Sequence, residues 1–174
     1  AICKDYVESI DAKINDWPVL KNTLYHDQKI IDLINMSAGD QKYLNSNRFF
    51  NSNRAVTNPT IKSAMENELK NSKKSKVKWN YNNLLPHIIL NYIIFKTGED
   101  NFQRLLDEVF REKAKTEYDA HFVETEISNS VDRSISNTLL ATRYDYLRIA
   151  KAMLDDWQND TCEGKYLKKL YERK

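Results

Sequence analysis

Apolar residues return every three or four positions along most of this chain, which is the period of one face of an α-helix. Near the start, Ile2, Tyr6, Ile10 and Ile14 recur at every fourth residue. This spacing predicts a first helix over about residues 2–15, with its polar residues turned away from the apolar stripe.

The same pattern predicts further helices, whose ends are marked by capping residues, proline and glycine. Residues 40–57 are rich in Asn and Ser and are expected to be irregular. The predicted helices run from Pro18 to about Met36, from the Thr57-Asn58-Pro59 start to Leu69, from Asn82 or Asn83 to Gly98, from Glu99 toward Tyr118 and Phe122, from about Ile127 to Trp157, and around Tyr166–Tyr171.

A helical fold agrees with the composition. The 174 residues include only 3 Gly and 3 Pro, fewer than the many tight turns of an all-β sandwich usually need. The length suits one domain with a core of its own. We therefore expect an all-α protein, a single compact multi-helix bundle of about six to eight helices that spans residues 1–174.

The two cysteines, Cys3 and Cys162, lie near opposite ends of the sequence. Their spacing fits neither a CxxC motif nor a zinc site. Because a bundle often brings its ends together, we expect one disulfide that ties the termini; two unrelated thiols are the alternative. The chain also opens at Ala1 without a methionine, so we expect a periplasmic or secreted protein, with a cytoplasmic one as the alternative.

The charge balance narrows the classes of function. With 27 basic and 25 acidic residues the net charge is +2, so the chain lacks the global positive field of a general nucleic-acid binder. No apolar run reaches the roughly 18 residues of a membrane span. An electrostatic function would have to come from a local patch.

The strongest local feature is a cluster of lysines followed by two aromatic residues. Such a cluster can bind an acidic protein surface, or it can hold phosphates and stack bases. The alternatives are a protein partner, a nucleic acid or anionic lipid, and a solvated loop with Trp79 turned inward. The cluster comprises Lys70, Lys73, Lys74, Lys76, Lys78, Trp79 and Tyr81.

A second candidate for partner binding is the segment from Arg143 to Arg148, which contains Tyr144. Arginine and tyrosine are enriched among the residues that dominate the free energy of binding at protein interfaces. Part of this segment must nevertheless face the core of a bundle, so Arg143 and Tyr144 are the residues assigned to the surface.

Three residues form a candidate metal site. Glu117, His121 and Glu124 are spaced by four and three, and on a continuous helix they would share one face. A solvated charged face is the alternative, because a di-iron bundle uses Glu-x-x-His on two helices and here the order is His-x-x-Glu, once. His26-Asp27 resembles the metal-binding pair of the HD-domain phosphohydrolases, but no further histidine precedes His26, so a polar surface pair is favoured.

No nucleophile elbow, P-loop or dinucleotide-binding glycine motif occurs in the sequence. No cofactor is therefore expected. The leading hypothesis is an exported, non-catalytic protein-binding protein, such as an inhibitor or immunity-type protein that blocks a toxin or enzyme. The alternatives are a helical metalloprotein or hydrolase that uses the Glu/His cluster, and a nucleic-acid-binding factor that uses the lysine-rich loop. The sequence indicates neither the partner nor the oligomeric state.

Overall fold

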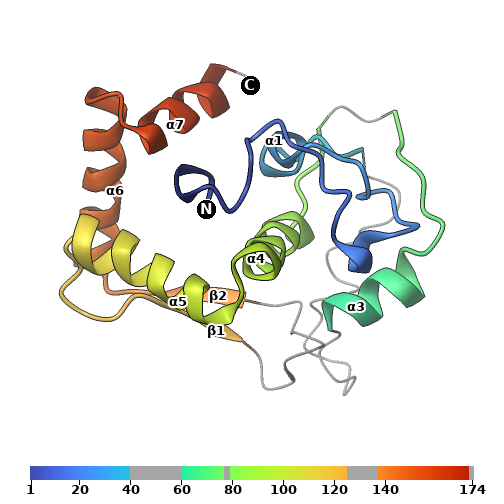
Figure 1. Ribbon diagram of the computed structural model, residues 1–174, viewed down its shortest axis with the longest axis horizontal. Helices are drawn as coiled ribbons and strands as arrows, with labels where there is room; N and C mark the ends of the chain where they lie inside the picture. Colours follow the sequence, from blue (N-terminus) through green and yellow to red (C-terminus); the bar gives the residue numbers. More distant parts are fainter. Residues whose placement is uncertain (40–59, 77–78, 125–136, 173–174) are drawn as a thin grey trace. The chain divides into compact units, whose positions relative to one another are not determined.

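The computed structural model describes residues 1–39, 60–76, 79–124 and 137–172 (Figure 1). This part of the chain is mostly helical, as the apolar spacing predicted, and it also contains a two-stranded sheet, β1-β2, which was not predicted. The elements are α1 (Ile30–Ile34), α3 (Ile61–Ser63), α4 (Leu84–Thr97), α5 (Glu99–Asp107), β1 (His121–Glu124), β2 (Asn137–Leu140), α6 (Arg143–Gln158) and α7 (Cys162–Glu172). Two π-helical segments, Ala64–Glu68 and Glu108–Lys113, continue α3 and α5.

The chain divides into two compact units, each built from separate stretches of sequence. The first unit comprises Ala1–Glu8, Ile93–Val123 and Thr138–Lys174, and the second comprises Ser9–Tyr92 and Glu124–Asn137. Helix α4 starts in the second unit and ends in the first.

The predicted helix over residues 2–15 is wrong. Only Ile2–Lys4 form a 3₁₀ turn, and this turn ends at Asp5 in the left-handed conformation. In the second unit, residues 10–14 instead pair through their backbone with residues 27–31 (Ile14 N donates to Gln28 O, and Ile31 N to Ile10 O). A spacing of four predicts a helix, but it is also twice the two-residue period of an extended chain. Ile10 and Ile14 therefore lie on the same buried face of this extended segment.

The core of the second unit contains the apolar faces predicted around Met65 and Ile88. Thr60 caps α3 by accepting a hydrogen bond from Ser63 N, whereas the predicted Thr57-Asn58-Pro59 start lies outside the described residues. The side chain of Asn82 accepts a hydrogen bond from Leu84 N at 2.8 Å and so begins α4, as predicted. The most deeply buried side chains of this unit include Ile61, Ala64, Met65, Leu69, Leu84, Leu85 and Ile88.

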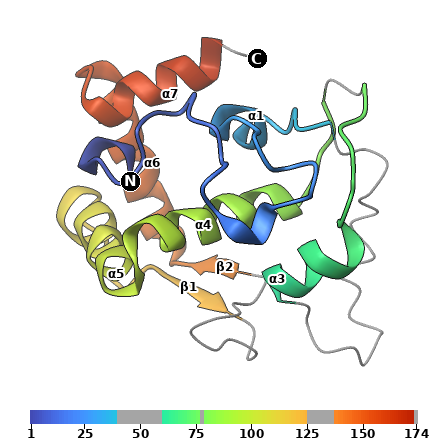
Figure 2. The same ribbon diagram turned by 45° about the vertical axis from the view of Figure 1, so that its right-hand side comes forward.

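The first unit contains α5, β1 apart from Glu124, β2 apart from Asn137, α6 and α7 (Figure 2). The helical run from Glu99 does not reach Phe122, because Lys115 adopts a left-handed φ of 57° and the chain then enters β1. The long helix predicted from Ile127 begins instead at Arg143, after β2; residues 127–136 lie outside the described residues. The final predicted helix is confirmed as α7.

Within the described residues, no helix is both long enough and apolar enough to cross a lipid bilayer.

Candidate binding surfaces

In the second unit, backbone hydrogen bonds hold residues 70–76 and 79–82, the described residues before α4, to the rest of the unit. Ser75 N donates to Gly39 O at 2.7 Å, and Asn80 N donates to Met36 O at 2.9 Å. At its end the buried Asn82 donates from Nδ2 to the Tyr25 hydroxyl at 3.3 Å. The described part of this segment is therefore anchored at several points.

Trp79 and Tyr81 are presented to solvent by this anchored segment. Each is 63% exposed, whereas Asn82 is buried. Exposure thus alternates along the last residues before α4, and the two rings occupy the outward positions. The interpretation of Trp79 as an inward-turned anchor is wrong, because Asn82 anchors the segment and leaves the indole outside.

The lysines that precede these rings make a locally cationic surface. Lys70, Lys73, Lys74 and Lys76 are exposed, and Lys78 lies outside the described residues. The sequence contains no Asp or Glu between Glu68 and Glu99. The ammonium of Lys74 donates to Gln28 Oε1 at 3.2 Å, a neutral partner that leaves its charge in place. We call Lys70, Lys73, Lys74, Lys76, Trp79 and Tyr81 the lysine–aromatic surface.

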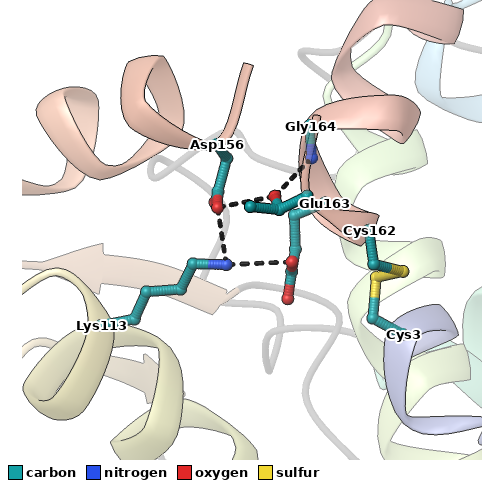
Figure 3. The surroundings of a disulfide bond; sticks show 7 residues. Cys3, Lys113, Asp156, Cys162, Glu163 and Gly164 are labelled. Carbon is teal, nitrogen blue, oxygen red and sulfur yellow. Dashed lines mark hydrogen bonds and ion pairs between the residues drawn. A yellow bond between two sulfur atoms is a disulfide. The ribbon is translucent and has the colours of Figure 1, made fainter. Parts of the chain in front are cut away.

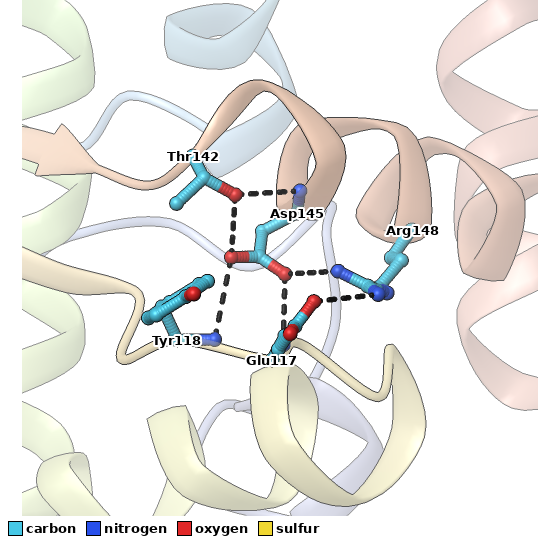
Figure 4. Close-up of polar contacts among 5 residues, drawn as sticks. All are labelled: Glu117, Tyr118, Thr142, Asp145 and Arg148. Atoms are coloured by element: carbon cyan, nitrogen blue, oxygen red, sulfur yellow. Dashed lines mark hydrogen bonds and ion pairs between the residues drawn. The ribbon is translucent and has the colours of Figure 1, made fainter.

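In the first unit, the fully buried carboxylate of Asp145 fixes the start of α6 (Figure 4). Thr142 caps the helix, since its Oγ1 accepts a hydrogen bond from Asp145 N at 3.1 Å. The same hydroxyl donates to Asp145 Oδ2 at 2.7 Å. The carboxylate also accepts hydrogen bonds from the backbone N–H groups of Glu117, at 2.8 Å, and Tyr118, at 3.4 Å.

Arg148 completes this cluster. Its Nη1 donates to Asp145 Oδ1 at 2.8 Å, and its Nη2 to Glu117 Oε2 at 3.1 Å. Burial alone would raise the pKa of Asp145, but the hydrogen bonds from Glu117, Thr142, Arg148 and Tyr118 together lower it below the ordinary value of 3.8. The side chain is therefore a buried anion that ties α6 to the loop before β1.

The opposite side of α6 exposes large apolar side chains. Tyr144 is 74% exposed, Leu147 67% and Leu154 54%. Their spacing of three and seven places them along one stripe of the helix, which also carries Lys151. Arg143 is exposed at the edge of this stripe. We call these five residues the α6 face.

The predicted disulfide is present in the first unit. Cys3 and Cys162 are bonded, with their Cα atoms 5.9 Å apart, although 159 positions separate them in the sequence (Figure 3). The bond joins the first turn of the chain to the first residue of α7. A second link in the same unit is the ion pair between Lys4 and Glu108, at 2.7 Å.

Polar contacts hold the junction of α6 and α7 beside the disulfide. Lys113 Nζ lies 2.9 Å from carboxylate oxygens of both Asp156 and Glu163 (Figure 3). Partial burial by itself would lower the pKa of Lys113. The hydrogen bonds from Lys113 to Asp156 and Glu163 outweigh this effect, so the pKa of Lys113 is raised. Thr161 Oγ1 donates to Asp156 Oδ1 at 2.8 Å and accepts from Gly164 N at 3.1 Å.

Gly164 permits a very close approach of the two helices. A β-carbon at this position would lie 1.9 Å from the carbonyl oxygen of Asp156, well inside van der Waals contact. Any larger residue would therefore push α7 away from the end of α6. The disulfide, the Lys113 cluster and this glycine together set the position of α7 against α6.

The proposed metal residues do not share a helix face. Glu117 lies in the loop before β1 and pairs with Arg148, whereas His121 and Glu124 belong to β1. The side chain of Glu124 lies outside the described residues, and among those described no group of three or more His, Cys, Asp or Glu side chains is placed to hold a metal ion. The premise of a continuous helix is therefore wrong. His26 contacts its neighbour Asp27 at 3.0 Å, in the second unit.

Asp145 and Leu147 lie inside the segment predicted to bind a partner but were given no role of their own, and Leu154 lies outside that segment. Thr142 and Asp145 have the Thr-x-x-Asp spacing of a helix start, and Thr142 caps the helix through Asp145 N. This signal was visible in the sequence and would have moved the predicted helix start from residue 127 to the vicinity of residue 143. The outward direction of Leu147 and Leu154 then follows from the burial of Asp145.

Comparison of the chain with protein-family models, with curated proteins and with solved structures finds no match.

Proposed function

We propose that this protein acts by binding another protein, without catalysis, and that the α6 face is its docking surface. The observation that carries the proposal is the exposure of Tyr144, Leu147 and Leu154 along one stripe of α6. Contiguous exposed apolar side chains are costly in water and are typical of interaction sites. Spacings of three and seven are those of a helix whose apolar residues insert into a partner's groove.

The α6 face is also rigidly supported, which favours tight binding. The Asp145 cluster holds the first turn, and the contacts of Asp156 hold the last. A helix that is already fixed in its bound geometry loses little conformational entropy on association. Tyr144 and Arg143 add residue types that are frequent among interface hot spots.

The partner's chemistry follows from the α6 face. It should offer an apolar groove for Tyr144, Leu147 and Leu154, with carboxylates at its rim opposite Arg143 and Lys151. An inhibitor or immunity-type protein that blocks a toxin or an enzyme would bind in this way. The disulfide favours action in an oxidising compartment, such as the periplasm or the extracellular medium.

The test begins with affinity capture from the source organism and identification of a stoichiometric partner. Its affinity is then measured by calorimetry for the unmodified protein and for Tyr144→Ala and Leu147→Ala. Each change should weaken binding about tenfold or more, as expected for a hot-spot residue. Tyr118→Ala and Val109→Ala are matched controls, because both side chains are exposed in the same unit but lie outside the α6 face. Equal affinities for all four variants would exclude the α6 face as the docking surface.

A further inference from the structure

The turn between α6 and α7 contains an acceptor sequence for N-linked glycosylation. Asn159, Asp160 and Thr161 follow the pattern Asn-x-Thr, in which the middle residue is not proline. We infer that Asn159 carries an N-linked oligosaccharide. The inference rests on the export that the disulfide favours, and it uses no residue of the α6 face.

Asn159 lies where an attached sugar chain has room. It is the residue at which α6 ends, and it is exposed, as are its neighbours Gln158 and Asp160. Asp160 adopts a left-handed φ of 51°, which turns the chain before α7 begins at Cys162. The acceptor therefore lies on an exposed turn, the kind of position at which secreted proteins carry glycans.

The amide of Asn159 can carry a sugar and keep its contact in the fold. Its Nδ2 donates one hydrogen bond, to the backbone oxygen of Asp155 at 2.8 Å. A side-chain amide nitrogen has two hydrogens. Glycosylation replaces one of them by a bond to the sugar, so the other remains to donate to Asp155.

The hydroxyl of Thr161, the third residue of the acceptor sequence, indicates when the sugar is transferred. In the folded protein Thr161 Oγ1 donates to Asp156 Oδ1 at 2.8 Å and accepts from Gly164 N at 3.1 Å. A transferase that recognises the acceptor through this hydroxyl needs it free of those contacts. Transfer to Asn159 therefore precedes the formation of the α6–α7 junction.

The sugar donor belongs to the class of lipid-linked oligosaccharide pyrophosphates. The bond between the anomeric carbon of the first sugar and the pyrophosphate oxygen breaks, and a bond from that carbon to Asn159 Nδ2 forms. The lipid pyrophosphate leaves with the electron pair of the broken bond, and one amide proton passes to a base. The transfer needs neither an oxidant nor a reductant.

The disulfide favours a compartment in which this transfer takes place. Cys162 directly follows Thr161 and is bonded to Cys3. Disulfides form and persist along the secretory route and outside the cell, and N-linked sugars are added at the start of the same route. Residues 159–162 thus combine two features of an exported chain.

A second acceptor sequence, Asn35-Met36-Ser37, offers a comparison within the chain. All three of its residues are only partly exposed, whereas Asn159 is exposed. The backbone of Asn80 also covers this turn, since Asn80 N donates to Met36 O at 2.9 Å. A sugar chain on Asn35 would compete with this packing, so we assign the glycan to Asn159 alone.

The test is the mass of the full chain purified from its source organism. We expect a mass above that of the polypeptide, and we expect treatment with peptide-N-glycosidase F to remove the excess. This enzyme leaves an aspartate in place of the modified asparagine, so mass spectrometry of tryptic peptides should find the conversion at position 159 and not at position 35. A source protein with the mass of the bare polypeptide would overturn the inference, and so would conversion at position 35 alone.

Variants produced in the same organism identify the acceptor. Asn159→Gln should lose the whole mass excess, whereas Thr161→Ser, which keeps the hydroxyl, should retain it. Asn35→Gln is the matched control, because it removes the asparagine of the other acceptor sequence, and it should retain the excess. Tyr144→Ala alters only the α6 face and should also retain it, so the glycan and the docking surface are tested separately. A full mass excess in Asn159→Gln would assign the modification to another residue and overturn the inference.

Discussion

Asp145 and Asp156 lie eleven residues apart on α6 and are the two buried residues of that helix. Eleven residues make about three turns, so the two carboxylates face the same side. Asp145 is held by Thr142 and Arg148, and Asp156 by Thr161 and Lys113. The covered side of α6 is thus fixed by hydrogen bonds and ion pairs, and Tyr144, Leu147 and Leu154 lie on the opposite side.

The stability of the first unit should depend on pH through Asp145. Because the folded pKa of this group lies below its ordinary value, the native state binds the proton more weakly than the unfolded chain does. The contribution of Asp145 to stability is therefore complete above about pH 4 and is lost as the pH falls through its folded pKa. Urea unfolding should show that Asp145→Asn is less stable than the unmodified protein at pH 7, and that the difference shrinks toward pH 2.

The control for this prediction is Asp155→Asn, which alters a more exposed carboxylate on the same helix that pairs with Lys151. It should cost less stability at pH 7 than Asp145→Asn does, since exposed ion pairs contribute at most about 1 kcal/mol. A difference between the unmodified protein and Asp145→Asn that stays constant from pH 7 to pH 2 would contradict the assignment of Asp145 as a buried anion.

Gly164→Ala separates helix propensity from packing. Propensity alone predicts that alanine inside α7 stabilises the protein by about 1 kcal/mol. The contact with Asp156 O predicts the opposite sign, with a loss of about 1–3 kcal/mol from overpacking. Thermal unfolding measures the difference. Lys165→Ala, at an exposed position of the same helix, should change stability by a few tenths of a kcal/mol, and a more stable Gly164→Ala would show that the two helices are less close than described.

The Cys3–Cys162 bond should be a large source of stability. In the chain-entropy model, closing a loop of this length contributes about 5 kcal/mol, and removal of native bridges typically costs about 2–5 kcal/mol. Addition of a reductant should lower the urea concentration at the unfolding midpoint. The double variant Cys3→Ser with Cys162→Ser should have the same lowered midpoint, and reductant should not lower it further.

Thiol titration tests the bond directly. The native protein should have no reactive thiol, and it should have two after reduction under denaturing conditions. Two reactive thiols in the untreated native protein would contradict the bond.

Trp79 should dominate the quenching of tryptophan fluorescence. It is 63% exposed, whereas Trp17 is buried in the second unit and Trp157 is partly covered in the first. Acrylamide should therefore quench a large fraction of the emission in the unmodified protein, and the most accessible fraction should disappear in Trp79→Phe. Trp17→Phe should leave that fraction unchanged. Identical quenching of Trp79→Phe and the unmodified protein would show that the indole is covered.

Two kinds of local signal were sufficient to predict helices correctly. Helix α4 has an asparagine cap at Asn82 and a glycine stop at Gly98, and most residues between them are apolar. Helix α7 has apolar residues at helical spacing close to the end of the sequence. In α4 the cap and the apolar pattern agree, and in α7 the apolar spacing alone was sufficient. The disulfide followed from the expectation that the ends would meet.

Other features depend on contacts between distant residues. The spacing of Ile10 and Ile14 is the same for a helix and for an extended strand, so only pairing with residues 27–31 decides between them. The direction of α6 depends on Asp145, whose burial requires backbone N–H donors of Glu117 and Tyr118. Periodicity in one segment carries no information about such donors, and for this reason the exposed side of α6 was not predicted.

The bond between Cys3 and Cys162 closes a covalent ring that includes every residue from 3 to 162. A protease that cuts this ring once cannot release a fragment, because the two pieces remain joined through the sulfur atoms. Cleaved and intact protein would therefore have the same mass, apart from one added water, until the sample is reduced. A nicked molecule would remain a single covalent unit, and electrophoresis would reveal the cut only under reducing conditions.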